Sequence, residues 1–194
     1  MKWFVSIFFF FILVNVFSQD TTKTFYPSGQ IKKQVIQRKL QNAISIVCII
    51  KFYENGNREY FMDDTTQIKY YTDGQVYEIS AIKDGKKSGV SKIFFDNKLT
   101  TETNYENNVQ QGWTTTYDPT TGKKGIDEFY KNGKQEGAVK YYNDDGTIAK
   151  IIYNKNGCPY KAEYFDKTQK ITLTLNKRKE IQKREGNFPL ICPH

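Results

Sequence analysis

The chain of 194 residues is long enough for one ordinary domain or for a repeat array, so length alone does not decide between the two. Only 38% of the residues are hydrophobic, whereas 15% are aromatic, with 14 tyrosines and 14 phenylalanines, and such side chains favour strands. The net charge of +8 suits an anionic partner, and the single histidine, His194, stands last, which argues against histidine-based catalysis.

Residues 1–18 have the features of a secretory signal peptide. An apolar stretch, residues 3–14, follows Lys2, and Val16 and Ser18 are small residues at the positions that a signal peptidase reads. We therefore expect cleavage directly after Ser18 and export to the periplasm, the cell envelope or the medium. The alternative is an uncleaved membrane anchor, which would need roughly 20 apolar residues, more than stand here. Export also argues against nucleic acid as a partner.

Residues 19–51 are predicted to form an N-terminal strand region with a degenerate first repeat. In this region Phe25 and Tyr26 precede the turn signal Pro27-Ser28-Gly29. Cys48 lies inside a run of apolar residues and is therefore predicted to be a buried strand residue.

Residues 52–175 are predicted to be a series of β-hairpin repeats, because aromatic residues recur in them at a spacing of about 23 to 25. In successive repeats they would form an aromatic ladder, which either packs the units together or offers a platform for a peptide, glycan or lipid. The ladder residues are Tyr70, Tyr71, Phe94, Phe95, Tyr117, Tyr141, Tyr142, Tyr164 and Phe165.

Two turn signals follow each aromatic group, so each period holds two short strands. Asp-Gly and Asn-Gly pairs tolerate the positive φ that tight hairpin turns need. A further glycine stands four residues after several of these turns, as in Gly85 to Gly89, and would let neighbouring backbones approach closely. The predicted turn glycines are Gly56, Gly74, Gly85, Gly89, Gly112, Gly133, Gly137, Gly146 and Gly157.

The segment from Phe129 to Gly146 resembles the variant MORN repeat, in which an aromatic pair, a turn glycine, a Gly-Lys-x-x-Gly turn and another aromatic pair follow one another. The resemblance covers roughly residues 52–170 and extends to Phe25 at most. It implies an all-β fold: an elongated, single-layer antiparallel sheet of stacked β-hairpin repeats. Related bacterial chains are the YwqK-like MORN-repeat proteins, often labelled antitoxin components.

Residues 176–194 are predicted to be a basic, flexible tail, with at most a frayed helix around residues 177–184. Three cysteines cannot all pair within one molecule, and Cys158 with Cys192 is the pair that we expect if a disulfide forms.

No cofactor and no metal site is expected. Cys192 and His194 lack the closely spaced partner ligands of a zinc site. The carboxylate pairs Asp63-Asp64 and Asp144-Asp145 are predicted to stabilise turns, because they stand where strands end. The chain is therefore predicted not to be an enzyme.

The sequence favours an exported, non-enzymatic repeat protein that acts as a protein-binding or scaffold module of a bacterial envelope or secreted fraction. A module that binds an anionic surface, either lipid headgroups or acidic glycans, is the alternative, because lysines such as Lys86, Lys87, Lys123 and Lys124 stand near hairpin ends. An antitoxin-like inhibitor of a partner protein is the second alternative.

Overall fold

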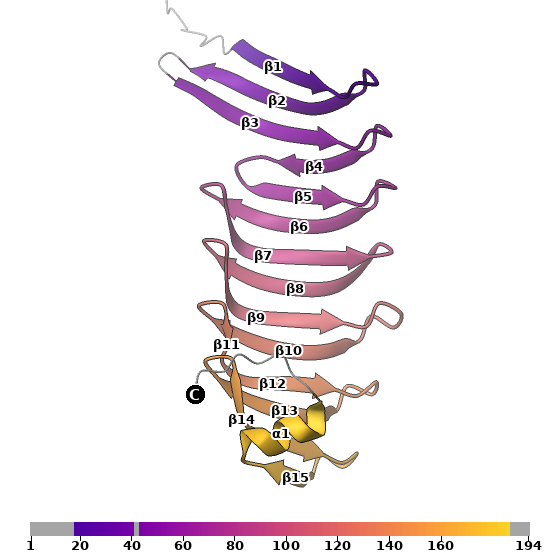
Figure 1. The fold of residues 1–194 in the computed structure, drawn as a ribbon, viewed down its shortest axis with the longest axis vertical. Coiled ribbons are helices and arrows are strands. Elements are labelled where there is room, and N and C mark those ends of the chain that lie inside the picture. The colour runs from indigo at the N-terminus through magenta and orange to yellow at the C-terminus, as the bar shows by residue number, and fades with distance from the viewer. Residues whose placement is uncertain (1–17, 41–42, 187–194) are drawn as a thin grey trace, which may run out of the picture.

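The computed structural model describes residues 18–40 and 43–186, and these form one open antiparallel sheet of 15 strands. Each strand pairs with the strand that follows it in the chain, apart from the short β11, which pairs with β10 alone. Figure 1 shows the strands stacked in chain order along one axis, from β1 at one end to β15 at the other. The predicted fold class, an elongated single-layer sheet of stacked hairpins, is confirmed.

The strands are mostly five to ten residues long and leave only short turns between them. Their bounds are Ser18–Phe25 (β1), Ile31–Leu40 (β2), Ala43–Phe52 (β3), Arg58–Met62 (β4), Thr66–Tyr70 (β5), Val76–Lys83 (β6), Lys86–Phe95 (β7), Lys98–Glu106 (β8), Val109–Tyr117 (β9), Lys124–Lys131 (β10), Lys134–Gln135 (β11), Gly137–Tyr142 (β12), Ile148–Lys155 (β13), Cys158–Phe165 (β14) and Ile171–Leu175 (β15).

One turn geometry recurs along the array and explains the repeat in the sequence. The backbone N–H of Tyr26 donates to the carbonyl of Gln30 at 2.8 Å, and the N–H of Gly29 donates back to Tyr26 at 2.9 Å. The same pair of bonds closes the turns that begin at Tyr53, Tyr71 and Asn143. Each of these turns holds a glycine with positive φ, which a residue with a side chain adopts only at a cost.

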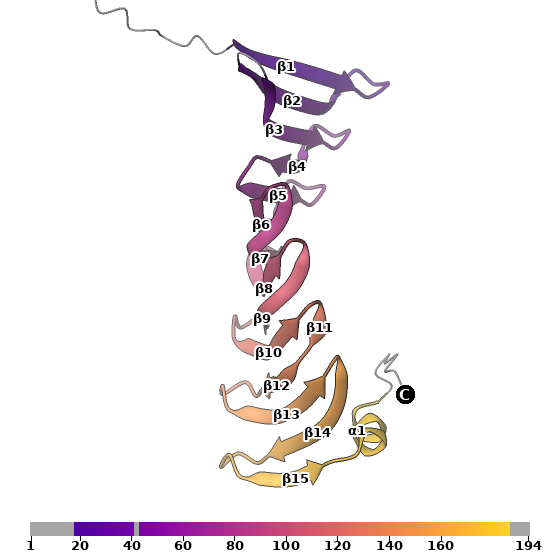
Figure 2. The same ribbon diagram turned by 90° about the vertical axis from the view of Figure 1, so that its left-hand side faces the viewer.

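The downstream glycines lie where the hairpin strands shift register. Gly89, with φ +108°, stands opposite a shift between Ser80 and Ile82, and a Cβ at this position would approach Ala81 Cβ to 3.1 Å. Glycine is therefore required here both by the dihedral angle and by the close contact. Figure 2 shows that the strands curve and that the single helix lies against one side of the sheet.

Small hydroxyl side chains, instead of apolar ones, are buried in the middle of the sheet. Ser80, Ser91, Thr103 and Thr114 lie opposite one another across four successive strands, and all four are buried. A protein of this shape therefore needs fewer apolar residues than a globular domain, in keeping with the low hydrophobic content.

The apolar core lies at the C-terminal end, under a helix in the segment 177–184, where the sequence predicts at most a frayed helix. Residues Arg178–Glu185 form α1, and its Ile181 is completely buried against Ile152 and Ala162. This part of residues 176–194 is not a flexible tail, because one apolar side chain anchors it to the sheet. Residues 1–17, which make up all but the last residue of the predicted signal peptide 1–18, and the end of the chain from residue 187 lie outside the described residues.

Among the described residues no helix is both long and apolar enough to span a membrane.

Candidate binding site

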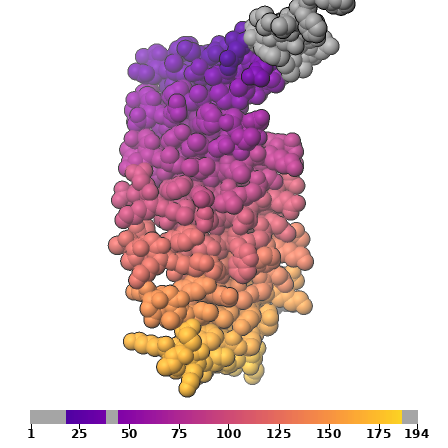
Figure 3. Space-filling view, turned by 180° about the vertical axis from the view of Figure 1, so that it is seen from behind, coloured from indigo at the N-terminus to yellow at the C-terminus, as the bar shows by residue number. Residues whose placement is uncertain are grey.

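The sheet has two faces that differ in what covers them. We call the face on which α1 packs the inner face, and the opposite one the outer face. Side chains alternate between the two along a strand, so the buried Val139 points to the inner face and its neighbour Ala138 to the outer face. Figure 3 shows the outer face as one continuous surface along the array.

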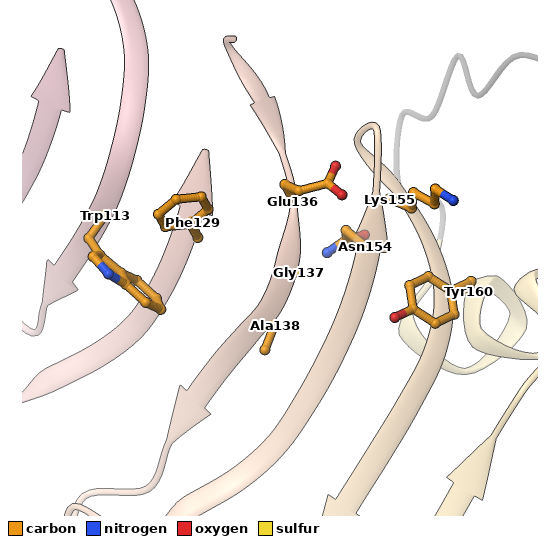
Figure 4. Close-up of a pocket in the computed structure, with 8 residues that line it drawn as sticks. All are labelled: Trp113, Phe129, Glu136, Gly137, Ala138, Asn154, Lys155 and Tyr160. Atoms are coloured by element: carbon orange, nitrogen blue, oxygen red, sulfur yellow. The ribbon is translucent and has the colours of Figure 1, made fainter. Parts of the chain in front are cut away.

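An open pocket of about 710 Å³ lies on the outer face, across strands β9 to β14. Two aromatic walls enclose a floor that consists of Gly137 and Ala138 on β12 (Figure 4). The small floor residues leave the space open, since a longer side chain at residue 138 would occupy it. The lining residues are Trp113, Phe129, Glu136, Gly137, Ala138, Asn154, Lys155 and Tyr160.

The aromatic walls are exposed, although their rings are held in place by neighbouring rings. Trp113 meets Phe129 edge to face, with ring centroids 5.3 Å apart, and Tyr160 lies 6.3 Å from the ring of Tyr153. Trp113 nevertheless remains 48% exposed and Tyr160 remains 51% exposed. Such amphipathic rings lose little conformational entropy on binding, so they are well suited to contact a partner.

Several side-chain polar groups that line the pocket make no hydrogen bond within the described part of the chain. Asn154 is only 5% exposed, yet its side-chain amide makes no hydrogen bond to any described residue. Figure 4 shows its nitrogen turned toward β12 and the pocket floor. The indole N–H of Trp113 and the ammonium of Lys155 also lack a partner within the described part of the chain.

Among the described residues, Glu136 is the one carboxylate that lines the pocket, and one of its oxygens is engaged. Glu136 Oε2 accepts a hydrogen bond of 2.9 Å from the backbone N–H of Asn156, which fixes the turn between β13 and β14. The second oxygen of Glu136 accepts no hydrogen bond from a described residue, so the pocket offers acceptors as well as donors.

The inner face carries a separate cluster of charges around Glu78. This residue is only 4% exposed, and its carboxylate accepts hydrogen bonds from Ser80 at 3.0 Å and Ser91 at 2.9 Å. Lys69 Nζ lies 2.8 Å from Glu78 Oε2, and Lys87 forms a second ion pair with the same carboxylate. Burial would raise the pKa of Glu78, but the bonds from Lys69, Lys87 and Ser91 lower it to about 2.

The Glu78 cluster is suited to structure and not to proton transfer. A carboxylate with a pKa of about 2 cannot take a proton from a serine hydroxyl near neutral pH, so Ser80 and Ser91 lie beside no effective base. The cluster instead links β5, β6 and β7 through one buried anion. Among the described residues no group of His, Cys, Asp and Glu has the arrangement of a metal site.

All nine glycines predicted to shape turns adopt positive φ. They are distributed along both ends of the hairpins and position strands without entering the pocket, with the exception of Gly137.

The predicted ladder residues lie at successive units, but no two of the described ladder rings contact each other. Several are instead fixed by their hydroxyl groups. Tyr71 donates to the carbonyl of Phe94 at 3.2 Å, and Tyr117 and Tyr142 donate to the carboxylates of Glu102 and Asp127. These tyrosine hydroxyls thus link neighbouring strands by hydrogen bonds to a backbone carbonyl or to carboxylates.

The carboxylates predicted for turns have that role in part. Asp63 accepts from the backbone of Thr65 and Thr66, and Asp145 accepts from the backbone of Thr147. Asp64 and Asp144 make no comparable side-chain bond within the described residues.

The cysteines follow their predicted environments as far as they are described. Cys48 is a buried, free cysteine in β3. Cys158 is part of a disulfide. Its expected partner, Cys192, and the terminal His194 lie outside the described residues, so the pairing stays a prediction.

The pocket residues were not identified from the sequence, although one signal for them exists. Trp113 stands directly after the downstream glycine of its unit, Gly112, and Val90 and Ala138 stand directly after Gly89 and Gly137. This position points to the outer face, where Val90 is 42% exposed. An aromatic residue at this outward-facing position, where the packing of the sheet requires none, is the sequence signal for the pocket.

Residues 21–37 match the family model of the MORN repeat variant. The chain contains a variant MORN repeat. The match covers most of the β1–β2 hairpin, including the turn that begins at Tyr26, and that MORN turn is the one whose hydrogen bonds recur at Tyr53, Tyr71 and Asn143. A MORN repeat indicates a repeat protein with a binding role. No curated protein matches the chain significantly.

Proposed function

We propose that this protein is an exported, non-enzymatic MORN-repeat protein that binds a partner protein through the outer-face pocket. The observation that carries the proposal is the pair of exposed rings, Trp113 and Tyr160, that stand on either side of a pocket with a small-residue floor. Tryptophan and tyrosine are the residue types that contribute most to binding energy in protein interfaces.

The rigidity of the site supports binding without rearrangement. Each wall comes from a different hairpin, and the antiparallel sheet fixes the separation of those hairpins. A scaffold of this kind presents its contact residues at little entropic cost, because the strands are already ordered before the partner arrives.

A non-enzymatic role agrees with the electrostatics of the described residues. Hydrogen bonds hold the pKa values of Glu78, Asp127 and Glu163 below their ordinary values, against the opposing effect of burial. These carboxylates are therefore stable anions that bind neighbouring lysines, tyrosines and hydroxyls. Residues 1–18 support export, because they have the pattern of a signal peptide.

Affinity capture from the envelope fraction of the source cells tests the proposal. The wild-type chain should retain a protein that Trp113→Ala does not retain, and Phe95→Ala should behave as the wild type. Phe95 is a suitable control because it is 61% exposed but lies outside the pocket. Capture of the same proteins by wild type and Trp113→Ala would show that the pocket is not the site.

Attachment to an anionic surface is the second candidate, and one observation favours it. Lys131, Lys134 and Lys155 are exposed and form no ion pair with a described residue. Of the lysines that the sequence singled out, however, Lys87 and Lys124 are paired with Glu78 and Asp127. Binding to anionic vesicles that falls steeply with salt would favour this candidate, whereas capture that tolerates salt would favour the protein partner.

An inhibitor of a partner protein would use the same pocket. An activity assay on the captured partner, with and without the chain, would distinguish an antitoxin-like inhibitor from a scaffold.

A further inference from the structure

Cys158 is part of a disulfide, and the sequence identifies its partner. Cys48 is a free cysteine, and the chain has three cysteines in all. Within one chain Cys192 is therefore the partner that remains for Cys158. Cys158 is the first residue of β14 and lies opposite Lys155 across the turn after β13. The cross-link thus joins the start of β14 to a residue that follows α1, and the closed loop contains both β15 and α1.

The helix α1 is short, and few contacts of its own hold it in place. It has eight residues, whereas an isolated helix shorter than about 12 residues is marginal in water. Its N-cap residue, Lys177, makes no side-chain cap bond, and the buried Nε of Arg178 has no hydrogen-bond partner among the described residues. Besides the bonds of Glu185, one buried side chain, Ile181, attaches it to the sheet. A helix of this kind needs a further restraint.

The side chains under α1 are the apolar core of the array. Ile152 and Ala162 are buried against Ile181, and Figure 2 shows α1 beside the last strands of the sheet. The partly buried side chains that pack around this cluster are Tyr141, Tyr164 and Leu175. Without α1 these apolar side chains would face water next to β15, the last strand of an open sheet. Because exposed apolar faces and open strand edges favour aggregation, the ends of repeat arrays need a cap, and α1 is suited to this role.

The cross-link limits how far α1 can move from the sheet. Cys192 stands six residues after Gly186, the C-cap residue of α1, so at most roughly 20 Å of extended chain joins the helix to the disulfide. At its other end α1 follows β15 after Asn176 and Lys177. The helix is therefore attached at both ends while the disulfide is intact, and at one end after reduction. The loss of one attachment lowers the effective concentration of the helix at its place on the sheet.

We propose that the disulfide between Cys158 and Cys192 holds α1 on the sheet as a redox-controlled cap. When a dithiol reduces it, the S–S bond breaks and both cysteines become thiols, while the dithiol gives up two electrons and two protons and becomes a disulfide. The helix then leaves the sheet, and Ile152 and Ala162 become accessible to water. The capped form is the one expected in an oxidising compartment, to which an exported protein is delivered.

Hydrogen exchange of the full chain with and without dithiothreitol tests the proposal. Peptide mapping without reductant should give a linked pair of fragments that contain Cys158 and Cys192. Reduction should speed exchange of the α1 amides at least about tenfold, because cross-links that close loops of this size typically favour the closed state by more than that. Exchange in β5 to β7 should stay unchanged. Fluorescence of the apolar dye anilinonaphthalene sulfonate should rise in parallel, since the dye binds exposed apolar surface.

Three variants separate the cross-link from other effects of the reductant. Cys192→Ser should show fast exchange of α1 without reductant and no response to dithiothreitol. Cys48→Ala is the matched control, because it removes the free cysteine of β3 and should keep the wild-type response. Ile181→Ala leaves the disulfide in place but weakens the contact of the cap, so it should raise dye fluorescence in the oxidised chain.

Unchanged exchange of α1 after reduction would overturn the inference. Equal acceleration in every strand would overturn it too, because the array would then unfold as a whole. So would a linked fragment pair that joins two chains, since the helix would not be held by its own chain. Equal capture of a partner by wild type and Trp113→Ala would contradict the proposed function alone, because none of the pocket residues belongs to α1.

Discussion

Replacement of Glu78 by glutamine should destabilise the array more than any other single loss of charge that the structure shows. Glutamine keeps the size of the side chain but removes the anion that holds Lys69 and Lys87. The pKa of Glu78 falls from 4.5 to about 2 on folding, which at about 1.4 kcal/mol per pKa unit corresponds to about 3 kcal/mol of stability near neutral pH. We expect a loss of that order in the free energy of unfolding.

The sign of the pH dependence is fixed by the direction of the shift. Because the folded-state pKa is the lower one, the contribution is complete above pH 4.5 and is lost as the pH falls toward 2. The difference between wild type and Glu78→Gln should therefore shrink over this interval.

Urea unfolding followed by circular dichroism measures the total effect, and hydrogen exchange of β5 to β7 shows whether it is local, since repeat arrays can open unit by unit. Glu102→Gln is the matched control. The Glu102 side chain is 32% exposed and pairs with the more exposed Lys92, so its loss should cost less than about 1 kcal/mol. Equal stability of Glu78→Gln and wild type at pH 7, or a difference that does not change with pH, would refute the reasoning.

Four further substitutions test how the strands and the helix α1 are held together. Gly89→Ala should lower the free energy of unfolding, measured by thermal unfolding, by about 2 kcal/mol or more, and Gly137→Ala by about 1 kcal/mol. Both glycines have positive φ, but of the two only Gly89 would bring a Cβ within 4 Å of a neighbour. Equal losses in the two variants would contradict the close contact at Gly89. Tyr71→Phe should lose about 1 kcal/mol, since its hydroxyl donates to Phe94 across units, and an unchanged urea midpoint would show that this bond is not needed. Glu185→Gln should speed hydrogen exchange in α1 at pH 7, because the variant loses the charge that holds Lys150. Burial would raise the pKa of Glu185, but bonds from Lys150 and Tyr164 lower it, so the exchange rate of the wild type should approach that of the variant as the pH falls below 4.5. Parallel pH profiles of the two proteins would show that the Glu185 carboxylate does not anchor the helix.

The array itself could be predicted because its turns leave a local signature. Each hairpin turn needs residues that accept positive φ, and the glycines and asparagines that provide it stand at regular positions in the sequence. The aromatic residues beside the turns repeat for a similar reason, since Tyr26, Tyr53 and Tyr71 each donate to a carbonyl of the next unit. Local chemistry that recurs in every unit is visible without knowledge of the tertiary contacts.

The helix α1 could not be predicted in the same way, because its stability is not local. It contains a single buried apolar residue, Ile181, and therefore no apolar stripe of helical period. Its anchorage depends on the contact of Ile181 with Ile152 and Ala162, and on the bonds of Glu185 to Lys150 and Tyr164. Those contacts link residues far apart in the sequence, so only the structure reveals them.

The pocket could be located in part by the repeat, and one more substitution tests how. The residue after the downstream glycine points to the outer face in every unit in which that glycine is present. The turn does not restrict which residue stands there, and the successive units have Val90, Trp113 and Ala138. Specificity would then reside in this variable position, and Ala138 matters because it is small.

Ala138→Phe should fill the floor of the pocket and reduce capture of the partner protein about tenfold, while the circular dichroism spectrum stays that of the wild type. Val90→Phe enlarges the equivalent residue in a unit that contributes nothing to the pocket, and should leave binding unchanged. If Ala138→Phe captured the partner as the wild type does, the space above β12 would not be where the partner binds. If Val90→Phe weakened binding equally, the effect would come from the fold of the units and not from the pocket.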